Sequence, residues 1–567
     1  MGFEISILPV IFFSILSIVL VTLFFKRFGA FRLFWVVWFM MLLSAIIPYV
    51  MVVGILPYDI SRCLFGKIAT NSKELHLVLD ILYWTSFVLT WAINPLLVSY
   101  LRYPYSIGIK RRIWLTIREN LIFWGLILAA VFVGVIILFI TNLMTISNIL
   151  PLAISLANGY GLLVLCVTLG YGFIQMPRTI WQKANPASAY LYCLQDISQQ
   201  TSVCSTTVAD CDALLVLCQN GKDLLRGEKK KIWNDKGEPK LNHLIEIKQS
   251  LPIPERCKQG ESKNKKIKKL RKLEWANFTH SQLEDVFELL EDITQNIEAT
   301  SSYVSDASKK ALRYLRLYNH KLNIPLVILK RIFAIIVLLV NLCCLWSEIT
   351  LMFNIKLSLF YMLSHLQIPQ IINIVFISTP ILAYLMFVGS WTLRHFRIGS
   401  FFRFIVGHTN SNTLNYFSII LCRLGPTIGF HYMQQIGAYD SEYQKVMGVM
   451  NVVVFIGTKW NLYAPILLIL IMIATVFQLF ERIMFACGKD IVTYDTAIMN
   501  VKSLQDGEEV LCELESDAKN LIDAGMNYMR IMDHATLFKK PKREIEESLL
   551  SEPSSPNRNF IQNTSFY

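Results

Sequence analysis

The chain of 567 residues is rich in apolar side chains: 54% of its residues are hydrophobic and only 17% are charged, with a mean hydropathy of +0.46. Soluble globular domains carry about 25% charged residues, so this composition excludes a single water-soluble globule. The formal net charge of +13 fits basic cytoplasmic loops, because lysine and arginine gather on that side of membrane proteins.

Long apolar runs predict nine membrane crossings. A helix needs about 20 apolar residues to cross the hydrocarbon core, where its backbone must satisfy its own hydrogen bonds. Residues 121–177 form one uncharged stretch that is long enough for two crossings, with a turn near residues 142–148. The other expected crossings are residues 5–25, 33–58, 81–101, 332–354, 371–393, 414–433 and 460–480. Residues 357–366 and 446–457 are too short to cross, so each is expected to be either re-entrant or interfacial.

The basic residues predict the orientation. Glu4 precedes the first span and Lys26 and Arg27 follow it, which is the reverse of a cleavable secretory signal. The first span is therefore expected to remain uncleaved in the membrane, with the N-terminus outside and the C-terminus in the cytoplasm. The loops that this orientation places inside carry most of the basic residues between spans, as the positive-inside rule requires.

The polar middle of the chain predicts two helical arms. In the first arm apolar residues recur every seven positions, and in the second they alternate in steps of three and four, which is typical of coiled coils. The seam residues are Tyr190, Ile197, Cys204, Cys211, Cys218 and Leu225, then Val286, Leu290, Ile293, Ile297, Val304, Ala311 and Tyr318. Two arms that leave and re-enter one membrane face predict an antiparallel coiled-coil hairpin in the cytoplasm, with pairing between subunits as the alternative.

These elements divide the chain into four parts. Residues 1–177 form a first bundle of five spans, 178–323 a cytoplasmic coiled-coil loop with a basic tip, 324–482 a second bundle of four spans, and 483–567 a cytoplasmic tail. One amphipathic helix is expected over residues 510–532 of the tail. The Ser/Pro-rich residues 551–559 are expected to be disordered.

The tip of the loop is strongly basic. It is interpreted either as a solvated surface or as an attachment site for anionic lipid or an acidic partner. Nucleic acid is not an expected partner, because the basic residues are not interleaved with aromatic residues. The candidate binding residues are Lys263, Lys265, Lys266, Lys268, Lys269, Arg271 and Lys272.

Three ionisable residues lie within predicted spans or at their ends, where a charge is costly and usually functional. Asp80 and Glu348 are expected near the outer ends of the third and sixth spans, and Arg423 well inside the eighth. Arg423 is expected to pair with Glu348 or Asp80. Such a pair could fix helix packing, or it could form a gate or a polar ligand site.

No catalytic residue, cofactor site or metal site is expected. The chain has no P-loop, G-x-S-x-G, H-E-x-x-H or paired C-x-x-C motif. Cys204, Cys211 and Cys218 are expected to pack as small apolar residues, because metal ligation usually needs closer pairs. The chain is therefore not expected to be an enzyme.

The motifs along the spans resemble the LIMR family, the limb-region and lipocalin-interacting membrane receptor group, and within it the branch of domain-containing protein two. The resemblance covers almost the whole chain and implies an N-out membrane protein with a coiled-coil loop. The residues that carry it are Leu82-Tyr83-Trp84-Thr85-Ser86, Leu89-Thr90-Trp91, Pro95, Gly170-Tyr171-Gly172, Pro177-Arg178, Trp181, Trp346-Ser347-Glu348, Phe404, Cys422-Arg423-Leu424, Pro426, Met447-Gly448 and Tyr463 with Pro465.

The resemblance also implies a function. Its branch is associated with G-protein-coupled receptor signalling, in particular adrenergic receptors, which makes a plasma-membrane signalling accessory the expected role. The expected partners are such receptors or their regulators, together with the lipid bilayer. The alternative is a transporter or channel for a small organic or lipid ligand, since ionisable residues lie within the spans.

Overall fold

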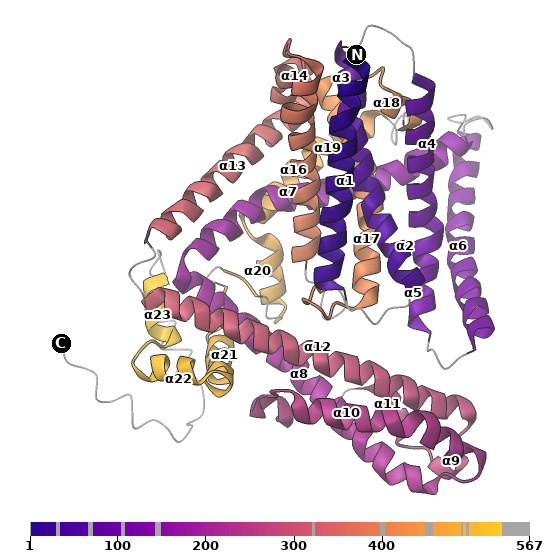
Figure 1. Cartoon of the computed structure of the whole chain (residues 1–567), viewed down its shortest axis with the longest axis vertical. Helices are drawn as coiled ribbons and strands as arrows, with labels where there is room; N and C mark the ends of the chain where they lie inside the picture. The colour runs from indigo at the N-terminus through magenta and orange to yellow at the C-terminus, as the bar shows by residue number, and fades with distance from the viewer. Residues whose placement is uncertain are drawn as a thin grey trace, which may run out of the picture.

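The computed structural model describes residues 2–29, 35–65, 72–103, 108–141, 149–262, 264–319, 324–396, 403–447, 458–488, 492–494 and 498–535. Within these ranges the chain is helical and forms no strand; one isolated bridge joins Gly29 to Thr409. The predicted all-α membrane class is therefore confirmed. The helices form two groups, a bundle of long apolar helices and a second helical group at one end of it (Figure 1).

The first group, here called the membrane bundle, contains a helix over each of the nine expected crossings. Several of its helices are continuous through short π-helical turns, which are common near functional positions. Its main elements are α1 (Gly2–Phe28), α2 (Trp35–Tyr49), η1 (Val50–Ile55), α3 (Leu56–Phe65), α4 (Ser72–Val88), η2 (Leu89–Ile93), α5 (Asn94–Arg102), α6 (Ile109–Ile140), α7 (Ile149–Ala184), α13 (Ile324–Phe353), α15 (Gln370–Ile372), η10 (Asn373–Ser378), α16 (Thr379–His395), α17 (Ser411–Ile436) and α19 (Thr458–Val476).

By length and apolar composition alone, eight helices in the described part of the chain could cross a membrane, or up to nine if one bent pair counts as a single span. That pair joins residues 463–476 to α20 (Leu479–Ala486) at a bend of 56°. This set differs from the expected nine at two helices. It includes α8 (Pro186–Gly221), which lies in the second group. It leaves out α17, because the polar residues of α17 lower its mean hydropathy.

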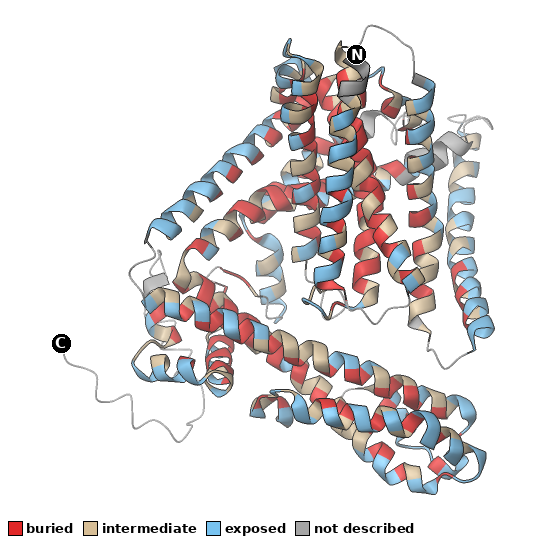
Figure 2. Ribbon diagram, viewed as in Figure 1, coloured by how far each residue is buried: buried red, intermediate tan, exposed pale blue. Residues whose placement is uncertain are grey.

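Helix α17 lies at the centre of the bundle and packs against α2, α5, α7 and α16. The side chain of Asn410 caps its first turn by accepting from the Asn412 amide, and Gly437 ends it with a φ of 72°, a conformation that glycine adopts without strain. Nearly all of its side chains are buried, while α6 and α13 expose apolar side chains along most of their length (Figure 2). This pattern fits a polar central helix shielded from lipid by apolar helices.

The second group is here called the helical unit. Its two long helices are α8 and α12 (His280–Asn319), which pack side by side (Figure 1). The shorter elements between them are η4 (Lys222–Leu224), α9 (Glu228–Ile232), η5 (Trp233–Gly237), α10 (Glu238–Ser250), η6 (Glu255–Gln259), α11 (Lys265–Leu270) and η7 (Trp275–Asn277).

The expected seam residues Tyr190, Ile197, Cys204 and Val304 are buried between these helices. A two-stranded coiled coil is nevertheless not confirmed, because the same apolar core includes Trp233, Trp275 and residues of the tail. The periodicity located the buried faces but not all the helices that cover them.

The tail differs from its prediction. In place of one helix over residues 510–532, it forms α21 (Val501–Leu514), α22 (Ser516–Asp523) and α23 (Tyr528–Ala535). The chain turns between α22 and α23 at Gly525, whose φ is 92°. Helix α21 packs directly on α8, so Gly507 lies against the backbone of Leu194. Residues 551–559, predicted to be disordered, lie outside the described residues.

Of the two segments predicted to be too short to cross, only the first lies fully in the described part of the chain. Residues 357–366 contain a short helix, α14 (Leu359–Ser364), which packs against α13 and α17. Most of residues 446–457 lie outside the described part of the chain.

Candidate functional site

Arg423 lies midway along α17 and is 2% exposed. Aromatic rings from the α4–η2 helix cover its guanidinium, whose Cζ is 5.1 Å from the ring centre of Phe87 and 5.7 Å from that of Trp91. The Tyr83 hydroxyl interacts electrostatically with the Arg423 charge and donates to Asn158 Oδ1 of α7 at 3.3 Å. Aromatic faces attract cations, so the charge is held by rings and hydroxyls.

Local sequence explains how these rings reach Arg423. Phe87 and Trp91 are four residues apart and lie on one side of their helix. The π-helical turn η2 contains Trp91 and is followed directly by Asn94, whose Nδ2 donates to Ser44 Oγ of α2 at 3.0 Å. That buried hydrogen bond fixes the end of the turn and with it the aromatic face that meets α17.

Glu348 does not pair with Arg423. Its Oε2 lies 2.7 Å from Nε2 of His431, and the two side chains are 5% and 4% exposed. Glu348 is on α13 and His431 is on α17, eight residues beyond Arg423. Asp80 is half-buried on α4, and no salt bridge joins it to another described residue. The predicted ion pair between Arg423 and either carboxylate is therefore not formed.

His431 is a functional candidate that the sequence analysis does not single out. It lies on α17 and is the partner of Glu348. The sequence signal that could have predicted this pair is the presence of two ionisable residues at comparable depth in different spans. The same two helices carry further buried polar atoms without a hydrogen-bond partner in the described residues, Ser347 Oγ on α13 and Gln435 Nε2 on α17.

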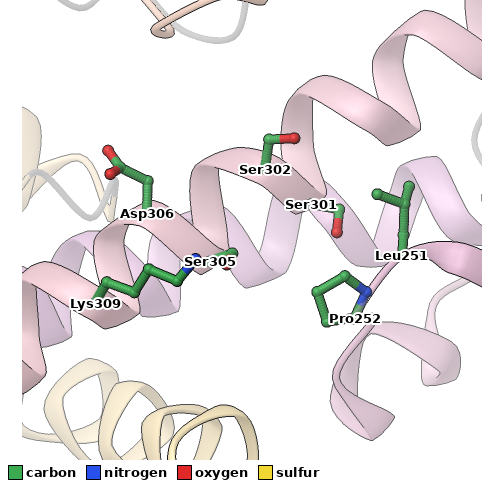
Figure 3. Close-up of a pocket in the computed structure, with 7 residues that line it drawn as sticks. All are labelled: Leu251, Pro252, Ser301, Ser302, Ser305, Asp306 and Lys309. Atoms are coloured by element: carbon green, nitrogen blue, oxygen red, sulfur yellow. The ribbon is translucent and has the colours of Figure 1, made fainter.

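The helical unit has a second feature of interest, two adjacent pockets along α12. The first has a volume of about 240 Å³, and Leu251 and Pro252 face the serines of α12 across it (Figure 3). The second follows along the same helix and shares Lys309 with the first. The lining residues on α12 are Ser301, Ser302, Ser305, Asp306 and Lys309, then Leu312, Arg313, Arg316 and Leu317. These residues are here called the α12 groove.

The basic tip forms part of the helical unit. Asn264 caps α11, and the helix buries Ile267 and Leu270 while its basic side chains stay exposed. Lys266 Nζ lies 3.6 Å from Glu288 Oε2 of α12. Lys265, Lys268, Lys269, Arg271 and Lys272 are exposed as well, and Lys263 lies outside the described residues. Lipid attachment by this surface stays a prediction.

Metal-ligand geometry is not found in the described part of the chain, where no group of three or more His, Cys, Asp or Glu side chains could hold an ion. Cys204, Cys211 and Cys218 are free and buried. Burial raises the pKa of Cys211 and of Cys218 to about 12, so both thiols are protonated at neutral pH. All three cysteines belong to the apolar core of the helical unit, where cysteine packs as a small apolar side chain.

The two helical groups meet at Arg403, just before α17. Its guanidinium lies 4.4 Å from the ring centre of Tyr303 on α12, and its Nη2 is 3.6 Å from Asp196 Oδ1 on α8. The same side chain hydrogen-bonds Gln200. Arg403 therefore ties the helical unit to the central helix of the membrane bundle.

Comparison with known proteins identifies the family of this chain. Residues 6–480 match the family described as LMBR1-like membrane protein. The chain belongs to this family. The resemblance drawn from its span motifs is confirmed, and both Arg423 and the Glu348–His431 pair lie in the matched region. Helices α21, α22 and α23 lie beyond it.

Several curated relatives match with similar identity. LMBR1 domain-containing protein 2 homolog A of Dictyostelium discoideum is 24% identical over 73% of this chain and 59% of its own length. The homolog of Drosophila melanogaster is 23% identical over 78% and 67%, respectively. The human relative, named G-protein coupled receptor-associated protein LMBRD2, is 24% identical over 72% and 64%. The chain thus spans about three fifths to two thirds of these relatives. No solved structure gives a significant match.

Proposed function

We propose that this chain is a receptor-associated membrane protein that engages G-protein-coupled receptors, or their regulators, through the α12 groove of its helical unit. Relatives from three vertebrates and a nematode carry the name G-protein coupled receptor-associated protein. The proposal places the helical unit in the cytoplasm, where it projects from the bundle as a docking surface. Receptors of the adrenergic type are the first class to test.

The charge of the α12 groove is the observation that carries this proposal. Lys309 and Arg313 line it, are exposed, and form no ion pair with any described residue. The neighbouring Lys310 is neutralised by Asp306 at 2.5 Å, and Arg316 is paired with Asp517 of the tail. An apolar floor with two unpaired cations is complementary to an acidic segment. The partner is therefore an acidic cytoplasmic loop or tail of a receptor.

Receptor-stimulated cyclic AMP tests this role. Cells that lack the protein are supplied with the natural chain, with a Lys309→Glu and Arg313→Glu double variant, or with a Lys230→Glu and Lys231→Glu variant. The last pair is exposed on α9, away from the groove, and changes the net charge equally. We expect the α12 variant to behave like the empty cells and the α9 variant like the natural chain. Equal rescue by both variants, at equal surface expression, would overturn the proposal.

A second candidate function is transport of a small organic or lipid ligand. The buried Glu348–His431 pair favours it, because carboxylate and imidazole groups inside bundles often carry protons in transporters. Flux into vesicles containing the purified protein, driven by a pH gradient, tests this function. Loss of flux in Glu348→Gln, with the fold retained, would support transport. Absence of proton movement in the natural chain would exclude proton-coupled transport by this pair.

A further inference from the structure

Hydrogen-bond donors without acceptors gather around Arg423. In the described part of the chain, Nε and Nη2 of Arg423 are buried and have no hydrogen-bond partner. The same holds for Nδ2 of Asn158 and for Nε1 of Trp91. Tyr83, whose hydroxyl interacts electrostatically with Arg423, donates to Asn158 Oδ1, and the Trp91 ring centre lies 5.7 Å from the guanidinium carbon. Four buried N–H-bearing atoms without acceptors thus belong to Arg423 and to two side chains of its surroundings, and no carboxylate of the described residues pairs with the arginine.

Nε and Nη2 form one edge of a guanidinium. Their N–H groups point in parallel, which matches the two oxygens of a carboxylate and allows two short charge-assisted hydrogen bonds. A buried cation without such a partner costs several kcal/mol in free energy. The unpaired atoms of Arg423 are therefore the two that a planar anion needs.

We propose that Arg423, with Asn158 and Trp91, binds the carboxylate of a lipid-soluble acid. The two oxygens accept from Nε and Nη2 of Arg423, and Asn158 Nδ2 and Trp91 Nε1 supply further donors. This site is separate from the α12 groove, and the proposal does not depend on the receptor role.

The position of the site favours a carboxylate with an apolar tail. Arg423 is midway along α17, and one carboxylate neutralises its single charge, whereas a phosphate would bring additional polar oxygens into the bundle. Aromatic side chains beside the site are exposed on the outer surface of the bundle: Trp84 is 38% and Tyr160 is 42% exposed. The Trp91 ring lies 6.0 Å from that of Tyr160. An aliphatic tail can pack on these rings while the head group reaches Arg423.

Binding of oleate tests the proposal, with methyl oleate as the neutral ligand of the same shape. The full chain is placed in phosphatidylcholine nanodiscs, and binding of radiolabelled oleate and the melting temperature are measured. We expect saturable binding of oleate and a rise in melting temperature, with neither for methyl oleate. Arg423→Gln is expected to lower affinity at least tenfold. Arg331→Gln, which removes an arginine that lies over Trp181 on another pair of helices, is expected to retain it.

Asn158→Asp keeps the test decisive even where Arg423→Gln fails to fold. Aspartate has the size of asparagine and keeps an oxygen for the Tyr83 hydroxyl, and it also puts a carboxylate beside the guanidinium. We expect this variant to fold, to melt no lower than the natural chain, and to lose oleate binding. Equal binding of oleate by the natural chain and by Asn158→Asp, equal binding of methyl oleate, or no oleate binding by the natural chain would each overturn the proposal.

Discussion

Glu348 of α13 and His431 of α17 form a hydrogen-bonded pair inside the bundle, with 2.7 Å between Oε2 and Nε2. The pair joins α13 to the central helix α17, and both side chains are almost completely buried. A buried acidic group needs a partner of this kind, because its desolvation is otherwise uncompensated.

Removal of one partner of this pair should destabilise the bundle. We expect His431→Ala to lower the free energy of unfolding by about 3–5 kcal/mol, because Glu348 keeps its buried polar oxygens without the imidazole. The melting temperature of the purified protein in detergent measures the effect. A Glu348→Leu and His431→Leu double variant should melt higher than His431→Ala. A melting temperature of His431→Ala equal to that of the natural chain would contradict the role of the pair.

The close contact between α7 and α17 predicts a sharp effect at Gly161. A Cβ at this position would lie 2.2 Å from Thr427 Oγ1, so Gly161→Ala should cost about 1–3 kcal/mol through overpacking. Adding Thr427→Ala should restore part of the loss, since the clashing oxygen is removed. Gly125 on α6 is the matched control, because a Cβ there meets no atom within 4 Å. An equal melting temperature for Gly161→Ala and Gly125→Ala would contradict this packing.

Docking of the tail on α8 should depend on pH through Glu508. Burial raises the pKa of Glu508 from 4.5 to about 7, while hydrogen bonds from the Tyr190 hydroxyl and the Tyr528 amide act to lower it. The docked state therefore binds the proton more tightly than the undocked state. Its stability is greatest below pH 4.5 and is lost as the pH rises through about 7.

Hydrogen exchange of α21 measures this dependence. We expect faster exchange at pH 7.5 than at pH 5.5, after correction for the intrinsic exchange rates. Glu508→Gln cannot titrate and should remove the difference, with protection at pH 7.5 at least as high as in the natural chain. Slower corrected exchange at the higher pH would have the opposite sign and would refute the account of Glu508.

The orientation predicted from the basic loops can be tested with epitope tags. A tag at the N-terminus should be stained on intact cells, and a tag at the C-terminus only after permeabilisation, because the basic loops stay inside. Asn277-Phe278-Thr279 has the sequence of an N-glycosylation site. It should carry no glycan, because the predicted orientation places the helical unit inside the cell. Staining of both tags on intact cells would contradict an odd number of crossings.

The sequence predicted the helices better than their contacts. Long apolar runs identify spans, because only a helix with apolar side chains is stable in the hydrocarbon core. This worked even for α17, which contains Arg423 and other polar residues. The heptad pattern located the buried faces of α8 and α12, because an amphipathic helix packs through its apolar face. The breaks in the tail were missed, because Gly525 allows a turn that apolar periodicity does not reveal.

The candidate site was predicted only in part. Sequence patterns identified Arg423 and Glu348 as unusual, since charges in spans are rare. Their partners depend on the rotation of each helix about its axis, which periodicity in a uniformly apolar span does not define. Arg423 therefore proved to lie among Tyr83, Phe87 and Trp91, while Glu348 met His431.

Proximity labelling from a tag on the C-terminal tail tests the receptor-associated role most directly. The natural chain is compared in intact cells with the Lys309→Glu and Arg313→Glu variant and with the α9 variant, at matched surface levels. The account predicts that receptors and G-protein regulators are labelled by the natural chain and the α9 variant, and several-fold less by the α12 groove variant. Labelling of bulk membrane proteins alone, unchanged by the groove substitutions, would contradict it.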